Sequence, residues 1–276
     1  MKSLVLKQLF LCVAVGFAIN LFGQRPVVER IDPPHWWVGF SNPTLELLVK
    51  GENITKDVKL NAVGVAIKQI IQPENAHYVR IILEITPSAQ PQNMELTFYN
   101  GKSKTVHSYA LEQREYGNKT LMGLNPADFI YLITPDRFAN GNPKNDVVKG
   151  MNETILDRNG PYKRHGGDIH GILDKLHYLK ELGVTAVWIN PMVENNQPEW
   201  SYHGYAITDH YAIDPRFGTL EEYRNLVNEM HKHGLKMVMD VVYNQWGDQH
   251  YLFKDLPEAD MVHQFEIYTQ TNYRAE

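Results

Sequence analysis

The chain has 276 residues, of which 43% are hydrophobic and 21% are charged, and its formal net charge is −5. This composition is typical of a soluble globular protein and excludes a disordered, fibrous or multi-span membrane chain; the acidic balance argues against nucleic acid as a partner, because phosphate binding needs clustered Lys and Arg. The length has room for one large or two smaller domains, but not for a small domain and a complete eightfold β/α barrel, which alone needs about 250 residues.

Residues 1–23 have the order of a secretory signal peptide. Lys2 and Lys7 precede an apolar run over residues 9–22 that is short for a transmembrane helix. The only cysteine, Cys12, lies inside this run and is not preceded by the Gly or Ala of a lipoprotein signal. We therefore predict a secreted or periplasmic protein that has no membrane attachment after cleavage and no disulfide.

Residues 24–120 predict an all-β domain. Apolar and polar residues alternate over residues 44–50, 78–85 and 94–99, which is typical of strands with one buried face. Between two such runs, Asn100-Gly101 favours a tight hairpin. The spacing indicates a small immunoglobulin-like sandwich, in which we see no nucleophile, base or ligand cluster.

Trp36 and Trp37 are adjacent aromatic residues near the start of this domain. Their rings could stack on a sugar. Because neighbouring residues of a strand face opposite ways, we expect at least one of the two in the core.

Residues 121–276 predict alternating strands and helices. Three short apolar runs are expected as parallel strands buried on both faces, at residues 129–133, 184–189 and 235–242. Amphipathic helices are expected between them, one over residues 169–182 and one beginning with the capping box of Thr219 and Glu222. The interpretation is the first three strands of a (β/α)8 TIM barrel, whose chemistry lies at the carboxyl ends of the strands.

Short side chains with oxygen atoms gather in the loop after the first of these strands and at the start of the next helix. They are Asn140, Asn142, Asn145, Asp146, Gly166 and Asp168. Two interpretations stay open on spacing alone. The set could bind calcium, which takes six to eight oxygen ligands, or it could be a turn-rich loop in which Asn and Asp cap their own backbone.

Two further segments are candidates for binding or catalysis. The loop at residues 202–211 is rich in Tyr and His, and it either holds a sugar or is packed by its own rings. Asp240 ends the third strand, where a carboxylate either serves a site or makes a structural hydrogen bond.

Four segments in fixed order carry a family resemblance. They read YLITPDRFANGNPKND from Tyr131, HGGDIHGILDKLHYLKELGVTAVWIN from His165, YHGYAITDHYAIDPRFG from Tyr202 and DVVYNQ from Asp240. These segments resemble the α-amylase family of glycoside hydrolases, closest to its neopullulanase and cyclomaltodextrinase branch, and the β domain is similar to the N-terminal domain of that branch. The resemblance runs from about Val27 to the last residue.

The resemblance implies a function and a set of site residues. It implies a retaining enzyme that acts on α-1,4 glucans such as maltooligosaccharides, cyclodextrins or pullulan. Whether the enzyme also cleaves α-1,6 bonds is an open question. Tyr205 would stack on the sugar at the cleavage subsite, and Asp240 and Gln245 would line that site. The loop described above would bind a structural calcium ion. Some members of the branch also form a homodimer through the N-terminal domain, and this chain is open to the same arrangement.

Two residues depart from the family's pattern. Gln245 stands where a His usually bonds a glucose hydroxyl, and an amide cannot carry charge. Asn142 stands where Asp is common, which leaves the implied calcium site one negative charge poorer.

No catalytic residue can be named in this chain. Retaining glycosidases need two carboxyl groups about 5–5.5 Å apart. In the resembled family these follow the fourth and fifth strands, and no Asp or Glu of this sequence matches them by motif. We therefore expect an N-terminal fragment of an α-glucan hydrolase that is inactive alone. The alternative is a non-catalytic glucan-binding protein built from the same parts.

Overall fold

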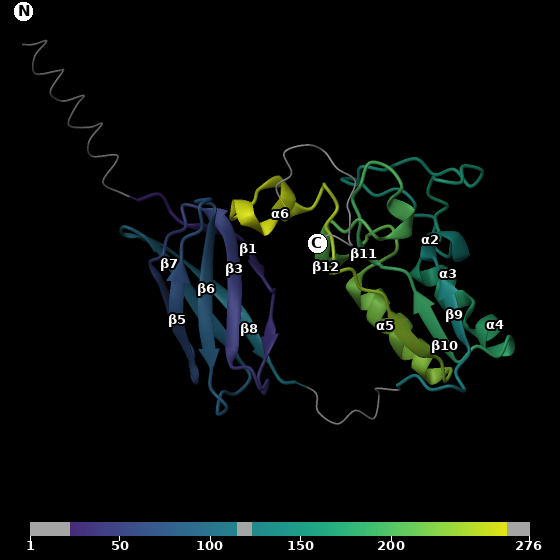
Figure 1. Ribbon diagram of the computed structural model, residues 1–276, viewed down its shortest axis with the longest axis horizontal. Coiled ribbons are helices and arrows are strands. Elements are labelled where there is room, and N and C mark those ends of the chain that lie inside the picture. Colours follow the sequence, from purple (N-terminus) through teal and green to yellow (C-terminus); the bar gives the residue numbers. More distant parts are fainter. Residues whose placement is uncertain (1–22, 115–122, 264–276) are drawn as a thin grey trace, which may run out of the picture. The chain divides into compact units, whose positions relative to one another are not determined.

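The computed structural model describes residues 23–114 and 123–263, which belong to two compact units. The first unit contains the β domain and the residues from Leu256 onward, and the second unit is Gly117–Asp255 (Figure 1). Within the described residues, no helix has the length and apolar character needed to cross a membrane. The predicted signal peptide, with Cys12, lies outside the described residues except for Gly23, so it stays a prediction.

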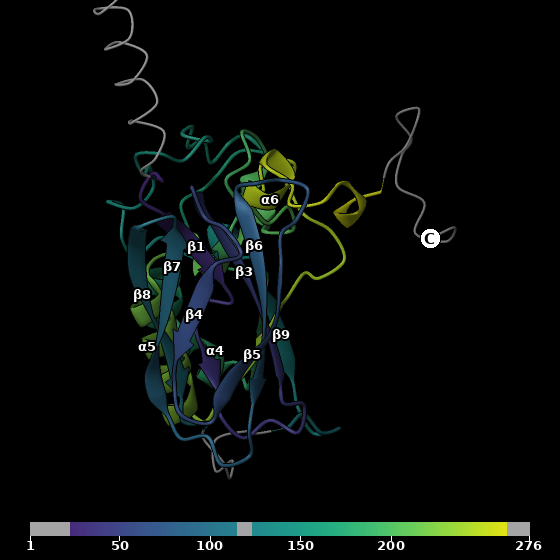
Figure 2. The ribbon, with the colours of Figure 1, turned by 90° about the vertical axis from the view of Figure 1, so that its left-hand side faces the viewer.

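The first unit consists of two four-stranded sheets, with strand orders β1-β3-β6-β5 and β2-β8-β7-β4. Figure 2 shows them as two layers that face each other. Their strands are β1 (Val27–Asp32), β2 (Trp36–Trp37), β3 (Thr44–Glu52), β4 (Val58–Asn61), β5 (Val65–Ile71), β6 (Tyr78–Ile85), β7 (Gln92–Asn100) and β8 (Ser103–Glu112). The predicted sandwich is thus confirmed.

Alternation along the strands builds the core of this unit. In β3, Leu47 and Val49 are fully buried while their neighbours point outward, and in β7 the same holds for Leu96 and Phe98. Period two therefore places one face of each strand between the sheets, as the sequence predicts.

The hairpin between β7 and β8 is confirmed, but its two-residue loop is Gly101-Lys102 rather than Asn100-Gly101. Asn100 pairs with Ser103, and Gly101 between them has a φ of 61°. Glycine adopts this left-handed conformation at no steric cost, whereas Asn100 ends β7 without a positive φ.

Residues 256–263 follow the second unit in the chain but belong to the first unit. They contain the 3₁₀ turn η2 (Ala259–Met261). The Asn75 side chain donates a hydrogen bond to the carbonyl of Leu256 at 3.0 Å, and Arg80 pairs with Glu258 at 3.5 Å. Residues 256–263 are therefore tied to the loop between β5 and β6 and to β6 itself.

The second unit is built on a parallel sheet of order β13-β10-β9. Its strands are β9 (Ile130–Ile133), β10 (Ala186–Ile189) and β13 (Lys236–Met239), and its longer helices are α3 (Ile169–Asp174), α4 (Leu176–Glu181) and α5 (Leu220–Lys232). Shorter elements are α2 (Pro135–Phe138), β11 (Val193–Glu194), η1 (Ser201–His203), β12 (Asp209–Ile213) and α6 (Tyr251–Lys254). This is the strand and helix alternation that the sequence predicts.

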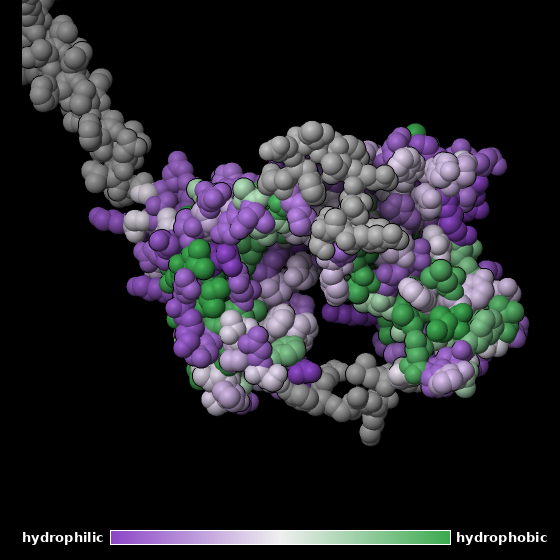
Figure 3. Space-filling model, viewed as in Figure 1, coloured by the Kyte–Doolittle hydropathy of each residue, from purple (hydrophilic) through white to green (hydrophobic). Residues whose placement is uncertain are grey.

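Only one face of the parallel sheet is buried. Val187 and Ile189 of β10 pack with helix residues, whereas Trp188 is 43% exposed and Leu132, its neighbour on β9, is 57% exposed. The prediction of strands buried on both faces is therefore wrong for the described residues, because their helices cover one face only. Figure 3 shows apolar side chains at the surface of this unit where β9 and β10 lie.

The predicted helix over residues 169–182 is broken in two. Lys175 leaves helical geometry, with φ −108° and ψ 7°, and its N–H donates to the carbonyls of Ile172 and Leu173. This tightened turn ends α3, and α4 starts directly after it. The apolar stripe still packs inward through Leu176 and Leu179, but Leu182 is exposed.

The capping box of α5 is confirmed. The Thr219 hydroxyl accepts a hydrogen bond from the N–H of Glu222 at 3.1 Å, and the Glu222 carboxylate accepts one from the N–H of Thr219 at 2.7 Å. The helix is amphipathic, as expected: Leu226 and Met230 are buried, whereas Leu220, in its first turn, is 46% exposed.

Candidate functional site

Asp240 lies one residue after β13, at the carboxyl end of the parallel sheet, and joins three segments. The indole N–H of Trp188, on β10, donates to Asp240 Oδ2 at 2.9 Å. The hydroxyl of Tyr205, in the loop after η1, donates to the same oxygen at 2.7 Å. Two donors fix the carboxylate, and they leave Oδ1 without a hydrogen-bond partner among the described residues. That oxygen can accept a hydrogen bond from a ligand.

Tyr205 is held as a neutral donor. Its pKa is raised to about 12 by burial, which is the largest cause, together with the hydrogen bond to Asp240 and the charge of that carboxylate. At neutral pH the phenol therefore keeps its proton and points it at Asp240.

Asp240→Asn should bring the pKa of Tyr205 down from about 12 toward 10, without reaching it, because burial remains. In the parent chain a pKa raised on folding makes the free energy of unfolding fall as pH rises between about 10 and 12, and the variant should show less of this fall. Tyrosine titration by NMR with ¹³C-labelled Tyr measures the shift. Tyr223, whose pKa is also about 12 but is raised by burial alone, is the internal control. An unchanged Tyr205 titration in the variant would contradict the contact.

Gln245 also lies beside Tyr205. Its side-chain N–H donates to the backbone carbonyl of Tyr205 at 3.3 Å, and its Oε1 accepts from the side chain of Asn244 at 3.1 Å. The three residues predicted to bind substrate, Tyr205, Asp240 and Gln245, are therefore brought together. Their contact with a sugar stays a prediction.

His203 and Trp188 also belong to this cluster, although neither was predicted as a site residue. His203 Nδ1 accepts a hydrogen bond from the N–H of Tyr205 at 2.9 Å, and the two rings stack with centroids 6.0 Å apart. Burial lowers the pKa of His203, which favours the neutral ring that can accept this bond. The sequence does contain a signal for Trp188. It is the only residue with a hydrogen-bond donor in its side chain in the otherwise aliphatic strand β10.

The loop that carries Tyr205 is anchored at Ser201, which is fully buried. The N–H of Ser201 donates to Glu153 Oε2 at 2.8 Å, its carbonyl accepts from Asn195 at 3.2 Å, and its hydroxyl accepts from Arg164 at 3.3 Å. Two residues from distant parts of the sequence, Glu153 and Arg164, and the nearby Asn195 thus hold the start of η1.

A buried ion pair supports the same region. Arg216 and Asp214 are both fully buried and form two hydrogen bonds, at 2.9 and 2.7 Å. Arg216 also donates to the backbone carbonyls of Glu153 and Asn195 at 3.2 and 2.8 Å. The guanidinium therefore has partners for its charge and connects two of the segments that hold Ser201.

The loop predicted to bind calcium presents unsatisfied oxygen atoms. Asn140 donates from Nδ2 to Asp146 Oδ1 at 2.7 Å. Asn140 Oδ1 and Asn145 Oδ1 are buried, yet neither has a hydrogen-bond partner in the described part of the chain. Buried acceptors without donors are costly, and hard cations take such oxygens as ligands. These residues fit a calcium ion. No group of three or more His, Cys, Asp or Glu that could hold a metal occurs within residues 23–114 and 123–263.

Asp168 shapes this loop. Its carboxylate is fully buried and accepts hydrogen bonds from the N–H groups of Gly141, Asn142 and Gly171, at 3.0, 2.7 and 2.6 Å. It thereby caps α3 and ties residues 141–142 to the helix start. A direct contact of Asp168 with an ion stays a prediction.

Gly166 and Asn142 contribute differently. A Cβ on Gly166, whose φ is 84°, would lie 2.6 Å from Asp146 Oδ1, so only glycine lets the two segments approach. The Asn142 side chain accepts from the N–H of Lys144 at 3.3 Å, which is the self-capping turn that the sequence left open.

Two family models match this chain. "Alpha amylase, catalytic domain" matches residues 131–274, and "Cyclomaltodextrinase, N-terminal" matches residues 30–115. Neopullulanase 2 of Thermoactinomyces vulgaris is 43% identical over 128 residues, and the cyclomaltodextrinase of Thermoanaerobacter pseudethanolicus is 38% identical over 129 residues; each alignment covers 46% of this chain and 21% of the relative. Among solved structures, an Anoxybacillus α-amylase is 44% identical, with 46% of this chain and 26% of that chain covered and a TM-score of 0.42.

The aligned part of this chain spans about a fifth of the length of these two relatives. The catalytic-domain match covers more than half of the present chain, and the N-terminal match covers the β domain before it. The resemblance seen in the sequence motifs is thereby confirmed, and the chain belongs to the α-amylase family.

Proposed function

We propose that this chain carries part of the substrate site of a retaining hydrolase of α-1,4 glucans, with maltooligosaccharides, cyclodextrins and pullulan as candidate substrates. Tyr205 would lie against the face of one glucose unit, and Asp240 Oδ1 would accept a hydrogen bond from one of its hydroxyls. Gln245 would fix the Tyr205 backbone and offer its amide to the sugar. The order of residues 1–23 supports secretion or a periplasmic location as part of the same proposal.

One observation carries this proposal. Trp188 and Tyr205 come from different segments, yet both donate to a single oxygen of Asp240 at the carboxyl end of a parallel sheet. In β/α barrels this end carries the active site. Aromatic rings beside a fixed carboxylate suit a pyranose, which offers both an apolar face and hydroxyl groups.

Calcium is proposed as a structural ion of the same unit. Asn140 and Asn145 would supply the unsatisfied amide oxygens, and Asp146 the negative charge. The ion would contribute binding energy to the fold and no chemistry to glycoside cleavage. Since Asp168 and Gly166 connect this loop to α3, an ion there would fix the segment that follows β9.

The 276-residue chain should release no reducing sugar from maltoheptaose or pullulan. None of its Asp or Glu residues matches the nucleophile or the acid of the family by motif, and bond cleavage with retention needs both. A reducing-sugar assay on purified protein, with a complete neopullulanase as positive control, measures this. Sugar release by a clean preparation would show that this chain does contain a nucleophile and an acid, and the proposal that it lacks them would be wrong.

Sequencing the gene beyond codon 276 distinguishes the hydrolase from the alternative, a non-catalytic glucan-binding protein. A reading frame that continues past codon 276 into one strand ending in Asp and a later strand ending in Glu would support the hydrolase. A stop codon directly after codon 276 would favour the glucan-binding protein.

A further inference from the structure

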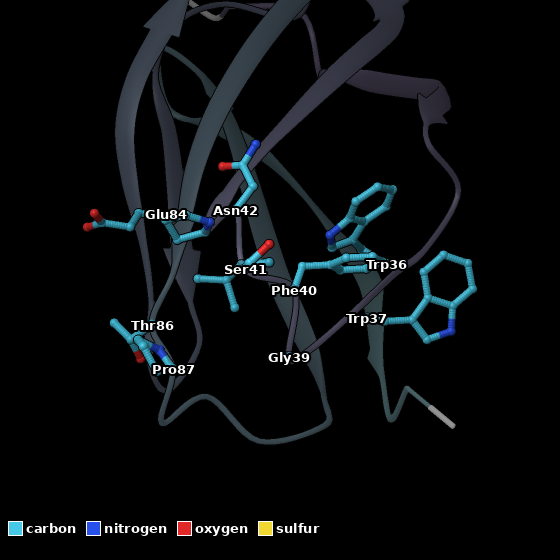
Figure 4. Close-up of a pocket in the computed structure, with 11 residues that line it drawn as sticks. Trp36, Trp37, Gly39, Phe40, Ser41, Asn42, Glu84, Thr86 and Pro87 are labelled. Atoms are coloured by element: carbon cyan, nitrogen blue, oxygen red, sulfur yellow. The ribbon is translucent and has the colours of Figure 1, made fainter. Parts of the chain in front are cut away.

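A pocket of about 300 Å³ opens on the first unit, beside the short strand β2. Figure 4 shows the rings of Trp36 and Phe40 against each other on one side, with Trp37 next to them. The loop of residues 39–43 and residues 84–87 at the end of β6 complete the wall. This volume lies at the lower end of the range for small-molecule sites.

The aromatic wall is held in place from behind. Trp36 packs against the core of the sandwich, as expected for one of the two adjacent indoles. Its ring centroid lies 5.1 Å from that of Phe40 and 5.8 Å from that of Trp37. The guanidinium carbon of Arg114 lies 4.5 Å from the Phe40 ring centroid, yet Phe40 is still 40% exposed. The pocket therefore presents fixed aromatic surface to solvent.

The neutral polar side chains of the pocket have hydrogen-bonding capacity to spare. The Ser41 hydroxyl and the indole N–H groups of Trp36 and Trp37 have no hydrogen-bond partner within the described residues. Asn42 uses its Oδ1 to accept from the N–H of Thr44 at 3.0 Å, which leaves its NH₂ group free to donate. The one carboxylate of the lining, Glu84, is already paired with Lys68 at 2.7 Å.

We propose that this pocket is a second α-glucan-binding site, distinct from the Asp240 site and located in the β domain. Aromatic faces combined with neutral donors and acceptors match a sugar, whereas a charged ligand would find no free counter-charge in the lining. The choice of an α-glucan rests on the proposed function. A polymer held at a second site is presented to the first at raised effective concentration.

Indole NMR of the full chain tests both sites in one titration. The sequence has five tryptophans, which give separate ¹⁵N–¹H indole signals. On addition of maltoheptaose, the signals of Trp36 and Trp37 should shift in a saturable way. A shift of Trp188 reports on the Asp240 site, so each proposal can fail without the other. Unchanged Trp36 and Trp37 signals would overturn the second site, and equal shifts with cellohexaose would overturn the α-glucan assignment.

Variants locate the binding. A double variant, Trp37→Ala with Phe40→Ala, should weaken the response of Trp36 to maltoheptaose at least tenfold. Ser41→Ala, which removes only an exposed hydroxyl, should weaken it about threefold and gives an answer if the double variant does not fold. Val106→Ala, at a 52% exposed apolar residue of β8 outside the lining, is the matched control and should change nothing.

Two results decide between sugar and protein as the occupant. Asp240→Asn should leave the Trp36 and Trp37 shifts intact, which supports a separate site. If the Trp37 and Phe40 substitutions instead change the oligomeric state in light scattering, with affinity for maltoheptaose unaltered, the pocket is a protein interface and the proposal is wrong.

Discussion

Calcium should raise the melting temperature of the chain by about 5–10 °C at a free concentration about 100 times the dissociation constant. At that concentration an ion that binds only the folded state adds about 2.7 kcal/mol, and about 2–4 °C per kcal/mol is typical for a protein of this size. The physical reason is that Asn140 Oδ1 and Asn145 Oδ1 are buried acceptors without donors in the described chain. An ion would satisfy both at once. Differential scanning fluorimetry in calcium and in chelator measures the shift.

Matched variants show whether this loop is responsible. Asn145→Leu removes one unsatisfied oxygen and should abolish most of the calcium effect while leaving the melting temperature in chelator unchanged or higher, because a costly buried acceptor is gone. Lys144→Ala changes an exposed residue of the same loop and should keep the full effect. A melting temperature that is the same in calcium and in chelator would remove the metal assignment.

Arg216→Ala should lower the free energy of unfolding by about 3–5 kcal/mol, the usual cost of removing one partner of a buried ion pair. The variant leaves the Asp214 carboxylate fully buried without its counter-ion. It also removes the donors to the carbonyls of Glu153 and Asn195. Urea unfolding followed by circular dichroism measures the loss.

An exposed ion pair of the same unit serves as the comparison. Lys232 and Glu229 approach to 2.6 Å, but the Lys232 side chain is 69% exposed. Lys232→Ala should cost no more than about 0.5 kcal/mol, because water screens such pairs. Equal losses for Arg216→Ala and Lys232→Ala would show that burial is not what makes the Arg216 pair important.

Features that depend on neighbouring residues could be predicted from the sequence. The hairpin after Asn100 follows from the backbone freedom of Gly101, and the capping box of Thr219 and Glu222 needs partners only three residues apart. Alternation with period two predicted the sandwich because each strand has one core face. The motifs after β10 and β13 also predicted that Tyr205 and Asp240 come close together.

Features that depend on distant partners could not be predicted in this way. Ser201 is held by Glu153, Arg164 and Asn195, and no spacing along the chain indicates that these residues meet. The break at Lys175 has no signal in the sequence, because the apolar stripe continues unbroken on both sides of it. The exposure of Trp188 depends on which face of a parallel sheet the helices cover, and a uniformly apolar run does not encode that choice.

The register of β10 decides which of its side chains reaches Asp240 in the second unit. Val187 and Ile189 point into the helix layer, and Trp188 between them reaches Asp240. A slip of this four-residue strand by a single position would send the indole into the core and two aliphatic side chains out of it. The hydrogen bond of the Trp188 indole N–H to Asp240 therefore reports on the register of β10: where this bond is present, the strand is in its native register. In a variant that keeps Asp240, loss of this bond points to a change in strand register, so the fold of that variant should be checked before a binding defect is assigned to the site.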